Sequence, residues 1–339
     1  MKYRYIPTFM IILFILIAGC INTNEKPENN EVKPVILNQQ MSTPIVLFNN
    51  TISHYSDHDV IMLENGTYFL VFTAYLSDVL RSSFSMDLLD WSNPNPIFTS
   101  NPHVLSDVKN MQFPRILQNN GGEIFIYYQT NIGDNTNEND QNWLTKSKNG
   151  LNWTEPIEIN TKISEKNIII NNNDEFIHSD AKFIDGTNFY KSEDGITWDL
   201  LSHVSFDIDD LIQSKNGKYY AISEDGAIYD SIDLLNWEER NRITVNQDIE
   251  LLEDSDGDLI IISDYYGYDG SDHPPKLFLY YSNDGSKWSK PMELNTNLYS
   301  HSDISLIEKG LGDYAIIVDQ KTSLNLFIIN KNEFIIEYE

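Results

Sequence analysis

One seven-residue phrase recurs five times along the chain, and its clearest copies are Ser192-Glu-Asp-Gly-Ile-Thr-Trp198 and Ser282-Asn-Asp-Gly-Ser-Lys-Trp288. The other copies are Ser85-Met-Asp-Leu-Leu-Asp-Trp91, Ser147-Lys-Asn-Gly-Leu-Asn-Trp153 and Ser231-Ile-Asp-Leu-Leu-Asn-Trp237. We call this phrase, Ser-x-Asp/Asn-Gly/Leu-x-x-Trp, the seven-residue repeat. Its tryptophans lie about 40 to 60 residues apart, which is the spacing of the blades of a β-propeller. The repeat therefore predicts an all-β fold, a propeller.

Each residue type in the repeat suits a tight turn that packs against a neighbouring sheet. The Asp or Asn side chain accepts backbone N–H bonds, and glycine adopts a positive φ without steric cost. The serine hydroxyl can fasten the start of the turn. The tryptophan supplies a large apolar ring that can insert between two sheets.

A second pattern accompanies the repeats: a polar residue leads an apolar strand, and a glycine turn follows about seven residues later. Two strands around such a turn form a hairpin, and hairpins of this kind build the blades. The six instances begin at Asp59, Pro114, Asp180, Asp210, Glu250 and Asp303. We therefore expect six blades, with five as the alternative because the segment around 176–198 is short.

An N-terminal fragment is expected to close the ring. Ser42-Thr-Pro-Ile-Val-Leu-Phe48 resembles the sequence after the seven-residue repeats, such as Ser289-Lys-Pro-Met-Glu-Leu294. A strand that joins the last blade in this way removes the open sheet edges that invite aggregation. The propeller domain is accordingly expected to span residues 41–339.

The first residues have the pattern of a targeting segment. Lys2 and Arg4 precede an apolar run that is shorter than the roughly 20 residues of a membrane span. Leu16-Ile17-Ala18-Gly19-Cys20 resembles the lipobox of bacterial-type lipoproteins. That resemblance implies a signal peptide at 1–19, a lipid on Cys20 and a position on the outer side of a cell membrane. The alternative is an uncleaved signal anchor with an incidental cysteine.

The composition indicates a tether after the targeting segment and excludes some classes of partner. Residues 20–40 are rich in Asn, Glu, Lys and Pro, which predicts a flexible tether behind the lipidated cysteine. The formal net charge of −28 repels nucleic acid and anionic headgroups. We therefore expect no nucleic-acid partner, and contact with the membrane only through the lipid anchor.

The leading residues of the innermost strands are expected to gather at one mouth of the central channel. They would bring together Asp57, Asp59, Asp180, Asp210, Glu250 and Asp303, with Arg115 nearby. Neighbouring carboxylates push their pKa values apart, so one can donate a proton while another stays ionised, as glycoside hydrolysis requires. Alternatively, each acid caps its own strand, pairs across the channel, or helps to hold Ca²⁺ or a cluster of waters.

The seven-residue repeat resembles the Asp-box, or BNR repeat, of sialidase-like propellers, and the copies with leucine resemble a variant in arabinanase-type glycosidases. In these families the box is structural, so none of its residues is assigned to the site. Tyr55-Ser-Asp57-His58-Asp59 resembles the first-blade motif of arabinanase-type enzymes, although His58 replaces the expected proline. This resemblance implies Asp57 or Asp59 as base, Asp180 as a second acid and Glu250 as proton donor.

The same comparison argues against true sialidase activity. Sialidases hold the substrate carboxylate with three arginines, because planar guanidinium groups pair with it in a bidentate way. Arg115 lies in a sequence that loosely resembles a sialidase motif, but no arginine follows Arg242. We therefore expect the protein to bind a carbohydrate at the acidic mouth of the channel. If the protein is an enzyme, it would hydrolyse that carbohydrate there. The rival is a non-catalytic propeller that scaffolds protein contacts or binds an envelope component.

No cofactor is expected. Asp254-Ser-Asp256-Gly257-Asp258 has the spacing of a calcium-binding turn, but the same sequence suits an ordinary acidic hairpin, which we favour. The histidines show no spacing typical of metal ligands.

Overall fold

The computed structural model describes residues 35–36, 45–47, 55–74, 79–98, 108–132, 141–160, 167–182, 185–245, 248–265, 276–294, 303–310, 312–320, 323–334 and 336. All of them belong to one compact unit, Pro34–Glu339. The expected signal peptide at 1–19, the lipidation site Cys20 and most of the expected tether lie outside the described residues. Within the described part, no helix is long and apolar enough to cross a membrane.

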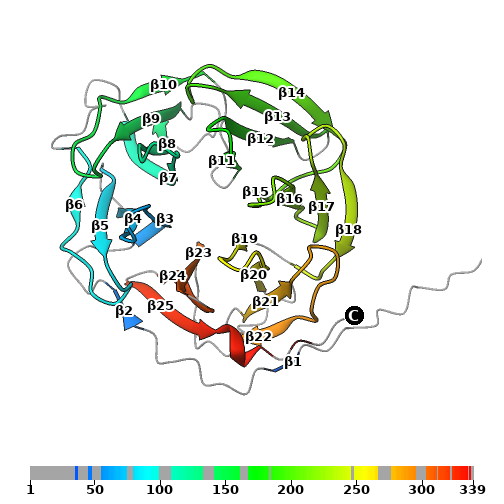
Figure 1. Ribbon diagram of the computed structural model, residues 1–339. Coiled ribbons are helices and arrows are strands. Elements are labelled where there is room, and N and C mark those ends of the chain that lie inside the picture. Colours follow the sequence, from blue (N-terminus) through cyan, green and yellow to red (C-terminus); the bar gives the residue numbers. More distant parts are fainter. Residues whose placement is uncertain are drawn as a thin grey trace, which may run out of the picture. The chain divides into compact units, whose positions relative to one another are not determined.

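Six sheets, each built on four antiparallel strands, surround a central axis and form the six blades of a propeller (Figure 1). Blades 1 and 2 contain β3 (Tyr55–Met62), β4 (Tyr68–Ala74), β5 (Arg81–Ser85) and β6 (Asn95–Pro96), then β7 (Val108–Gln118), β8 (Ile124–Ile132), β9 (Gln141–Ser147) and β10 (Ile157–Ile159). Blades 3 and 4 contain β11 (Ile168–Ile170), β12 (Phe176–Lys182), β13 (Gly186–Ser192) and β14 (Asp199–Val204), then β15 (Asp210–Gln213), β16 (Tyr219–Ile222), β17 (Ala227–Ser231) and β18 (Glu238–Arg242). Blades 5 and 6 contain β19 (Ile249–Glu253), β20 (Leu259–Tyr265), β21 (Lys276–Ser282) and β22 (Met292–Leu294), then β23 (Ile304–Gly310), β24 (Asp313–Gln320) and β25 (Ser323–Asn330).

The ring closes with an N-terminal strand, as the sequence predicts. The strand β2 (Ile45–Val46) pairs with β25 and supplies the outermost strand of blade 6. The innermost strands contact one another in the closed series β3, β7, β11, β15, β19, β23 and back to β3. The six-bladed arrangement is therefore confirmed, and the five-bladed alternative is wrong.

One described strand precedes residue 41. The strand β1 (Val35–Ile36) runs parallel to β22 and adds a fifth strand to blade 5. It lies inside the stretch that the sequence predicts to be a tether, before the predicted domain start at residue 41. Two residues that add to an outer sheet edge through backbone hydrogen bonds leave little trace in composition.

In the third blade, one innermost strand differs from the sequence prediction. Asp180 is expected to lead an innermost strand, but it lies on β12, the second strand of its blade, opposite Asn188. The innermost strand of this blade is β11, which has only three residues. The turn after β11 uses Asp174, with φ 61°, where the sequence pattern requires a glycine. The short strand and the missing glycine explain the wrong assignment.

Six hydrophobic clusters hold the propeller together, and each lies between two neighbouring blades. The tryptophan of each seven-residue repeat packs against the cluster that its blade shares with the preceding blade. The ring centroid of Trp153, for example, is 6.0 Å from that of Phe69, and the centroid of Trp237 is 5.3 Å from that of Phe189. The repeats therefore join neighbouring sheets.

All five repeats form the same turn between the third and fourth strands of blades 1 to 5. The serine Oγ accepts the N–H of the fourth residue at 2.9–3.0 Å. The Oδ1 of the Asp or Asn accepts the N–H groups of the fifth and sixth residues. The fourth residue has a φ of 63–75° in every copy, including the two copies with Leu88 and Leu234.

Blade 6 has a different residue at the corresponding place. After β25 the chain forms the short 3₁₀ helix η2 (Lys331–Glu333), which brings Phe334 onto blade 5. The ring of Phe334 stacks on Tyr314 at 5.8 Å and lies 6.3 Å from Tyr281. Phe334 thus takes the packing place that tryptophan has in the other blades.

Candidate active site

The innermost strands begin at one face of the ring, which we call the mouth. Because neighbouring strands of each blade are antiparallel, the connections between second and third strands also lie at this face. The seven-residue repeats lie at the opposite face, since each follows a third strand. Each innermost strand, or the position directly before it, contains a polar residue that bonds to or pairs with the second strand of its blade: Asp59, Arg115, Asn167, Asp210, Glu250 and Asp303.

Most of these residues meet around a small cavity at the mouth. Its volume is about 20 Å³, enough for one or two water molecules. The lining residues are Asp57, His58, Asp59, Phe113, Pro114, Arg115, Glu250, Asp303, Ile304 and Ser305. The structure therefore brings together five residues that the sequence predicts for the site, namely Asp57, Asp59, Arg115, Glu250 and Asp303.

Three aspartates connect neighbouring blades through backbone hydrogen bonds. Asp59 accepts the N–H of Val60 on its own strand at 2.8 Å and that of Ile116 in blade 2 at 2.6 Å. Asp210 bonds Leu211 and Leu251 in the same way, so it joins blades 4 and 5.

Asp303 joins blade 6 to blade 1. It accepts the N–H of Ile304 at 3.0 Å and the N–H of His58 at 2.9 Å. The alternative expected from the sequence, in which acids cap strands, thus describes one role of Asp59, Asp210 and Asp303. Asp210 does not belong to the lining of the cavity, and Asp180 is on another strand.

Arg115 is surrounded by acids. Its Nη1 lies 3.6 Å from Oδ1 of Asp59 and 3.8 Å from Oε1 of Glu250. Burial lowers the pKa of the Arg115 guanidinium, but the charges of Asp59, Glu250 and Asp210 outweigh it and raise this pKa. The positive charge of Arg115 is therefore permanent and already compensated by carboxylates.

Asp57 has an unusual backbone and an unusual acidity. It forms a bulge in β3 with φ 47°, and its Oδ2 accepts the N–H of Phe113, which has φ 56°, at 3.4 Å. Burial is the main cause that raises the pKa of Asp57 to about 7, and the charge of Asp303 adds to it. Burial also raises the pKa of Asp59, although Arg115 opposes this. Asp57 can therefore hold a proton near neutral pH while Glu250 faces a cation.

Sequence reasoning missed His58 and Phe113 as parts of the site. The bulge at Asp57 shifts the register between Ser56 and His58, and a second bulge shifts β7 between Gln112 and Arg115. Strict alternation along a strand would place these side chains differently. The only signal in the sequence is the histidine that stands where the resembling family has proline.

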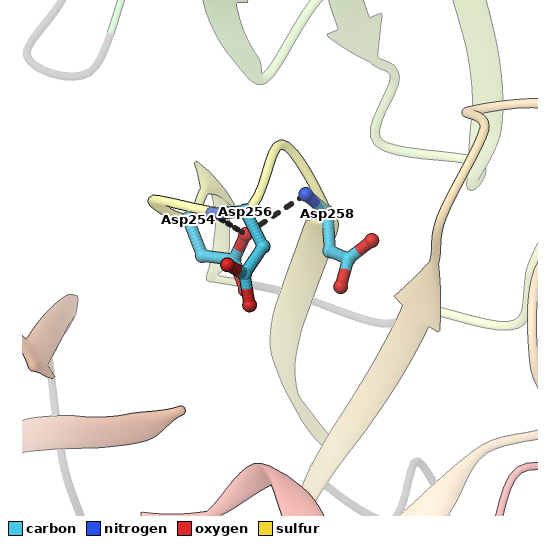
Figure 2. A group of neighbouring side chains, drawn as sticks. All are labelled: Asp254, Asp256 and Asp258. Carbon is cyan, nitrogen blue, oxygen red and sulfur yellow. Dashed lines mark hydrogen bonds between the residues drawn. The ribbon is translucent and has the colours of Figure 1, made fainter. Parts of the chain in front are cut away.

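The acidic turn 254–258, between β19 and β20, lies at the face opposite the mouth. The ammonium group of Lys331 lies among its carboxylates. Figure 2 shows Asp254, Asp256 and Asp258, with Oδ1 of Asp254 accepting the N–H groups of Asp256 and Asp258 at 3.0 and 2.8 Å. Carboxylate oxygens of the three lie within 4.8 Å of one another. Nζ of Lys331 lies 2.8 Å from Asp254, 3.3 Å from Asp256 and in contact with Asp258. An internal cation thus stands where a calcium ion would bind.

Two other arginines pair with acids outside the cavity. Arg240 and Arg242 lie on β18, the outermost strand of blade 4, where they pair with acids of the same blade. Among the residues that line the cavity, Arg115 is the one arginine.

Comparisons with known proteins support the fold. The profile of a family described as the DUF6242 β-propeller domain matches residues 106–251. No curated protein is detectably similar in sequence. A solved structure of a protein of unknown function from Dyadobacter fermentans is 14% identical, with a TM-score of 0.64, and 86% of this chain and 98% of that chain are covered.

Two glycosidases of known structure are also similar. The Hadza microbial sialidase Hz136 is 16% identical with a TM-score of 0.63, covering 83% of this chain and 66% of that chain. The α-L-arabinofuranosidase Arb93A from Fusarium graminearum is 12% identical with a TM-score of 0.62, covering 87% of this chain and 99% of that chain. At these identities the similarity establishes the propeller fold alone.

Proposed function

We propose that this protein binds a carbohydrate at the mouth of its propeller and hydrolyses a glycosidic bond there. The observation that carries the proposal is a pair of acids in one cavity with opposite environments. Burial and Asp303 raise the pKa of Asp57 to about 7, whereas Glu250 lies 3.8 Å from the guanidinium of Arg115. Two carboxyl groups whose environments differ in this way are what a glycosidase needs for its acid and its base or nucleophile.

The environments assign the roles. Asp57, which holds its proton near neutral pH, is the general acid, and Glu250, beside a cation, is the ionised partner. This exchanges the roles that the arabinanase resemblance implies for these two residues. Asp59 is less suited to proton transfer because its oxygens accept the N–H groups of Val60 and Ile116. Asp180 has no role in this proposal.

The fold and the repeats favour this class of substrate. Seven-residue repeats that resemble Asp-boxes, and structural similarity to a sialidase and an arabinofuranosidase, are both typical of carbohydrate-active propellers. Sialic acid itself does not fit the proposal, because the cavity offers one guanidinium and its charge is taken up by Asp59 and Glu250.

We also propose that the protein acts at a cell surface. The lipobox-like sequence that ends in Cys20 supports a lipid anchor, with the propeller facing outward and the carbohydrate or another envelope component as partner. Replacing Cys20→Ser should move the protein from the membrane fraction to the soluble fraction. Labelling with a radioactive fatty acid should disappear in parallel, and labelling that persists would refute the anchor at this residue.

The experiment that tests the activity is a turnover screen of the mature protein on aryl glycosides and on plant and microbial polysaccharides. Glu250→Gln and Asp57→Asn should each lower turnover by about a hundredfold or more, because proton transfer contributes on that order. Asp174→Asn is the matched control, since Asp174 also has a positive φ but lies in the turn between β11 and β12. Folded protein that turns over no substrate would refute hydrolysis and favour the scaffold function.

A further inference from the structure

The chain enters the propeller from the face that carries the seven-residue repeats, which we call the repeat face. In blade 5 the strand β22 follows the repeat that ends at Trp288, so β22 runs from the repeat face towards the mouth. The strand β1 lies parallel to β22, with Val35 opposite Met292 (Figure 1). Val35 is therefore at the end of β1 nearer the repeat face, and the chain reaches β1 from that side.

The anchor proposed at Cys20 is close to this point along the chain. Residues 21–34, which separate Cys20 from β1, span at most about 50 Å when fully extended. A segment of this length holds the domain at an effective concentration on the order of millimolar next to the membrane surface. A weak attraction between one face of the propeller and the lipid is then enough to orient the domain.

Exposed apolar side chains gather on the repeat face. Five of them occupy the second or fifth position of the repeats in blades 1, 2 and 4, with 41–77% of each residue exposed: Met86, Leu89, Leu151, Ile232 and Leu235. Three more lie at the ends of strands on the same face, namely Met62, Ile157 and Leu200. Eight of the ten large apolar side chains that are exposed among the described residues thus lie on this face. Such a one-sided distribution is typical of a contact surface rather than of scattered surface residues.

The acids of the repeats limit which surface can approach. Asp87 in blade 1 and Asp233 in blade 4 are exposed between the apolar residues of their turns. Backbone N–H groups that donate to them are the main cause that lowers the pKa of both, so both are ionised. An anionic lipid surface is therefore repelled, whereas zwitterionic or uncharged headgroups let the apolar side chains approach. The same charges oppose pairing with a second copy of this chain, because the two acidic faces would repel each other.

We propose that the repeat face rests on the membrane to which the protein is anchored, with the apolar side chains of the repeats in contact with zwitterionic or uncharged lipid. The inference rests on the proposed anchor at Cys20, but not on glycoside hydrolysis. It adds a direct contact to the lipid anchor that the sequence indicates. The mouth, at the opposite face, is then directed away from the membrane, where large glycans can reach it.

The first test measures which face lies near the lipid. In the Cys20→Ser chain, Leu235→Cys on the repeat face and Glu224→Cys at the mouth each supply a single thiol for a fluorescent label, and both positions are exposed in blade 4. A hexahistidine segment in place of residues 1–19 attaches either protein to phosphatidylcholine vesicles that contain a nickel-chelating lipid. A nitroxide lipid should quench the label at 235 at least about twofold more than the label at 224, since the strands separate the two faces by roughly 15 Å or more.

Equal quenching of the two labels, stronger quenching at 224, or no quenching at either position would overturn the proposal. Labelling of Cys20 with fatty acid tests the anchor separately. Its failure would refute the anchor, while selective quenching at 235 would still support the lipid contact of the repeat face. A stable dimer of the vesicle-free protein in sedimentation, dissociated by Leu235→Ser, would assign this face to a second copy and overturn the proposal.

The second test removes apolar contacts. Met86→Ser combined with Ile232→Ser should lower the quenching of a label at Leu151→Cys about twofold or more, because binding to a lipid surface scales with the apolar area that is buried. Val46→Ser is the matched control, since Val46 is also exposed but lies on β2, and it should leave the quenching unchanged. Phosphatidylglycerol in place of phosphatidylcholine should weaken the quenching. Unchanged quenching in the double variant would show that the tether alone orients the domain, and would overturn the proposed contact.

Discussion

At the scale of single residues, the buried position of Asp57 lowers the stability of the folded protein when its carboxyl group is ionised. Its pKa rises from 3.8 to about 7 in the folded protein, mainly through burial. Between these values the unfolded chain releases the proton first, so the folded protein binds more protons and loses stability as the pH rises. The full difference corresponds to at most about 4 kcal/mol above the folded pKa. A group held in this way is typical of a site that trades stability for chemistry.

Asp57→Asn should therefore stabilise the protein at high pH while lowering turnover by about a hundredfold or more. Asparagine tolerates the φ of 47°, and it removes the buried charge. Melting temperatures measured across the pH range should show a gain for the variant above about pH 7 that vanishes near pH 4. Asp174→Asn supplies the control for the exchange at a positive φ. A variant less stable than the parent at every pH would show that Asp57 is a structural residue.

At the scale of elements, the seven-residue repeats depend on a close approach between blades. Gly285 has φ 72°, and a Cβ at this position would clash with the ring of Tyr220 in the preceding blade. Gly66 has φ 79° but would meet nothing within 4 Å. The two glycines therefore separate the effect of backbone conformation from the effect of packing.

Gly285→Ala should be clearly more destabilising than Gly66→Ala. The left-handed backbone costs either variant roughly 1–2 kcal/mol, and overpacking should cost Gly285→Ala about 1–3 kcal/mol more. Urea denaturation of both variants against the parent measures the difference. If the losses are equal, the blades adjust to the extra atom and the repeat does not determine their spacing.

The same scale shows what the sequence can and cannot predict. The repeats predict the blades and their closure because each copy contains its own turn chemistry and its own tryptophan. The sequence pattern predicts the wrong strand for Asp180 in blade 3, because the innermost strand there has three residues and its turn uses Asp174 instead of glycine. For the candidate site, the sequence predicts that Asp57, Arg115 and Glu250 lie together, and all three line one cavity. His58 was missed because a bulge in β3 determines where its ring lies, and a pattern of alternation cannot reveal a bulge.

At the scale of the whole molecule, blade 6 is held to the ring by both ends of the domain. The N-terminal strand β2 completes its sheet, and the segment after β25 reaches across to blade 5. There Lys331 contacts Asp254, Asp256 and Asp258, and the side chain of Asp254 is only 1% exposed. Tyr314 of blade 6 also donates to Asp254, at 2.6 Å. One buried carboxylate thus connects the last blade, the C-terminal segment and blade 5.

Lys331→Met should loosen this junction and turn the acidic turn into a cation site. Loss of the ammonium leaves Asp254 buried without its cation, which costs roughly 3–5 kcal/mol and should lower the melting temperature by several degrees. The three carboxylates remain within 4.8 Å of one another, so calcium at about millimolar concentration should restore much of the loss in the variant. The parent protein should not respond, because its own ammonium fills the position. Lys287→Met, at an exposed lysine, controls for the change of residue type. A variant as stable as the parent, and indifferent to calcium, would show that the N-terminal strand alone holds the last blade in place.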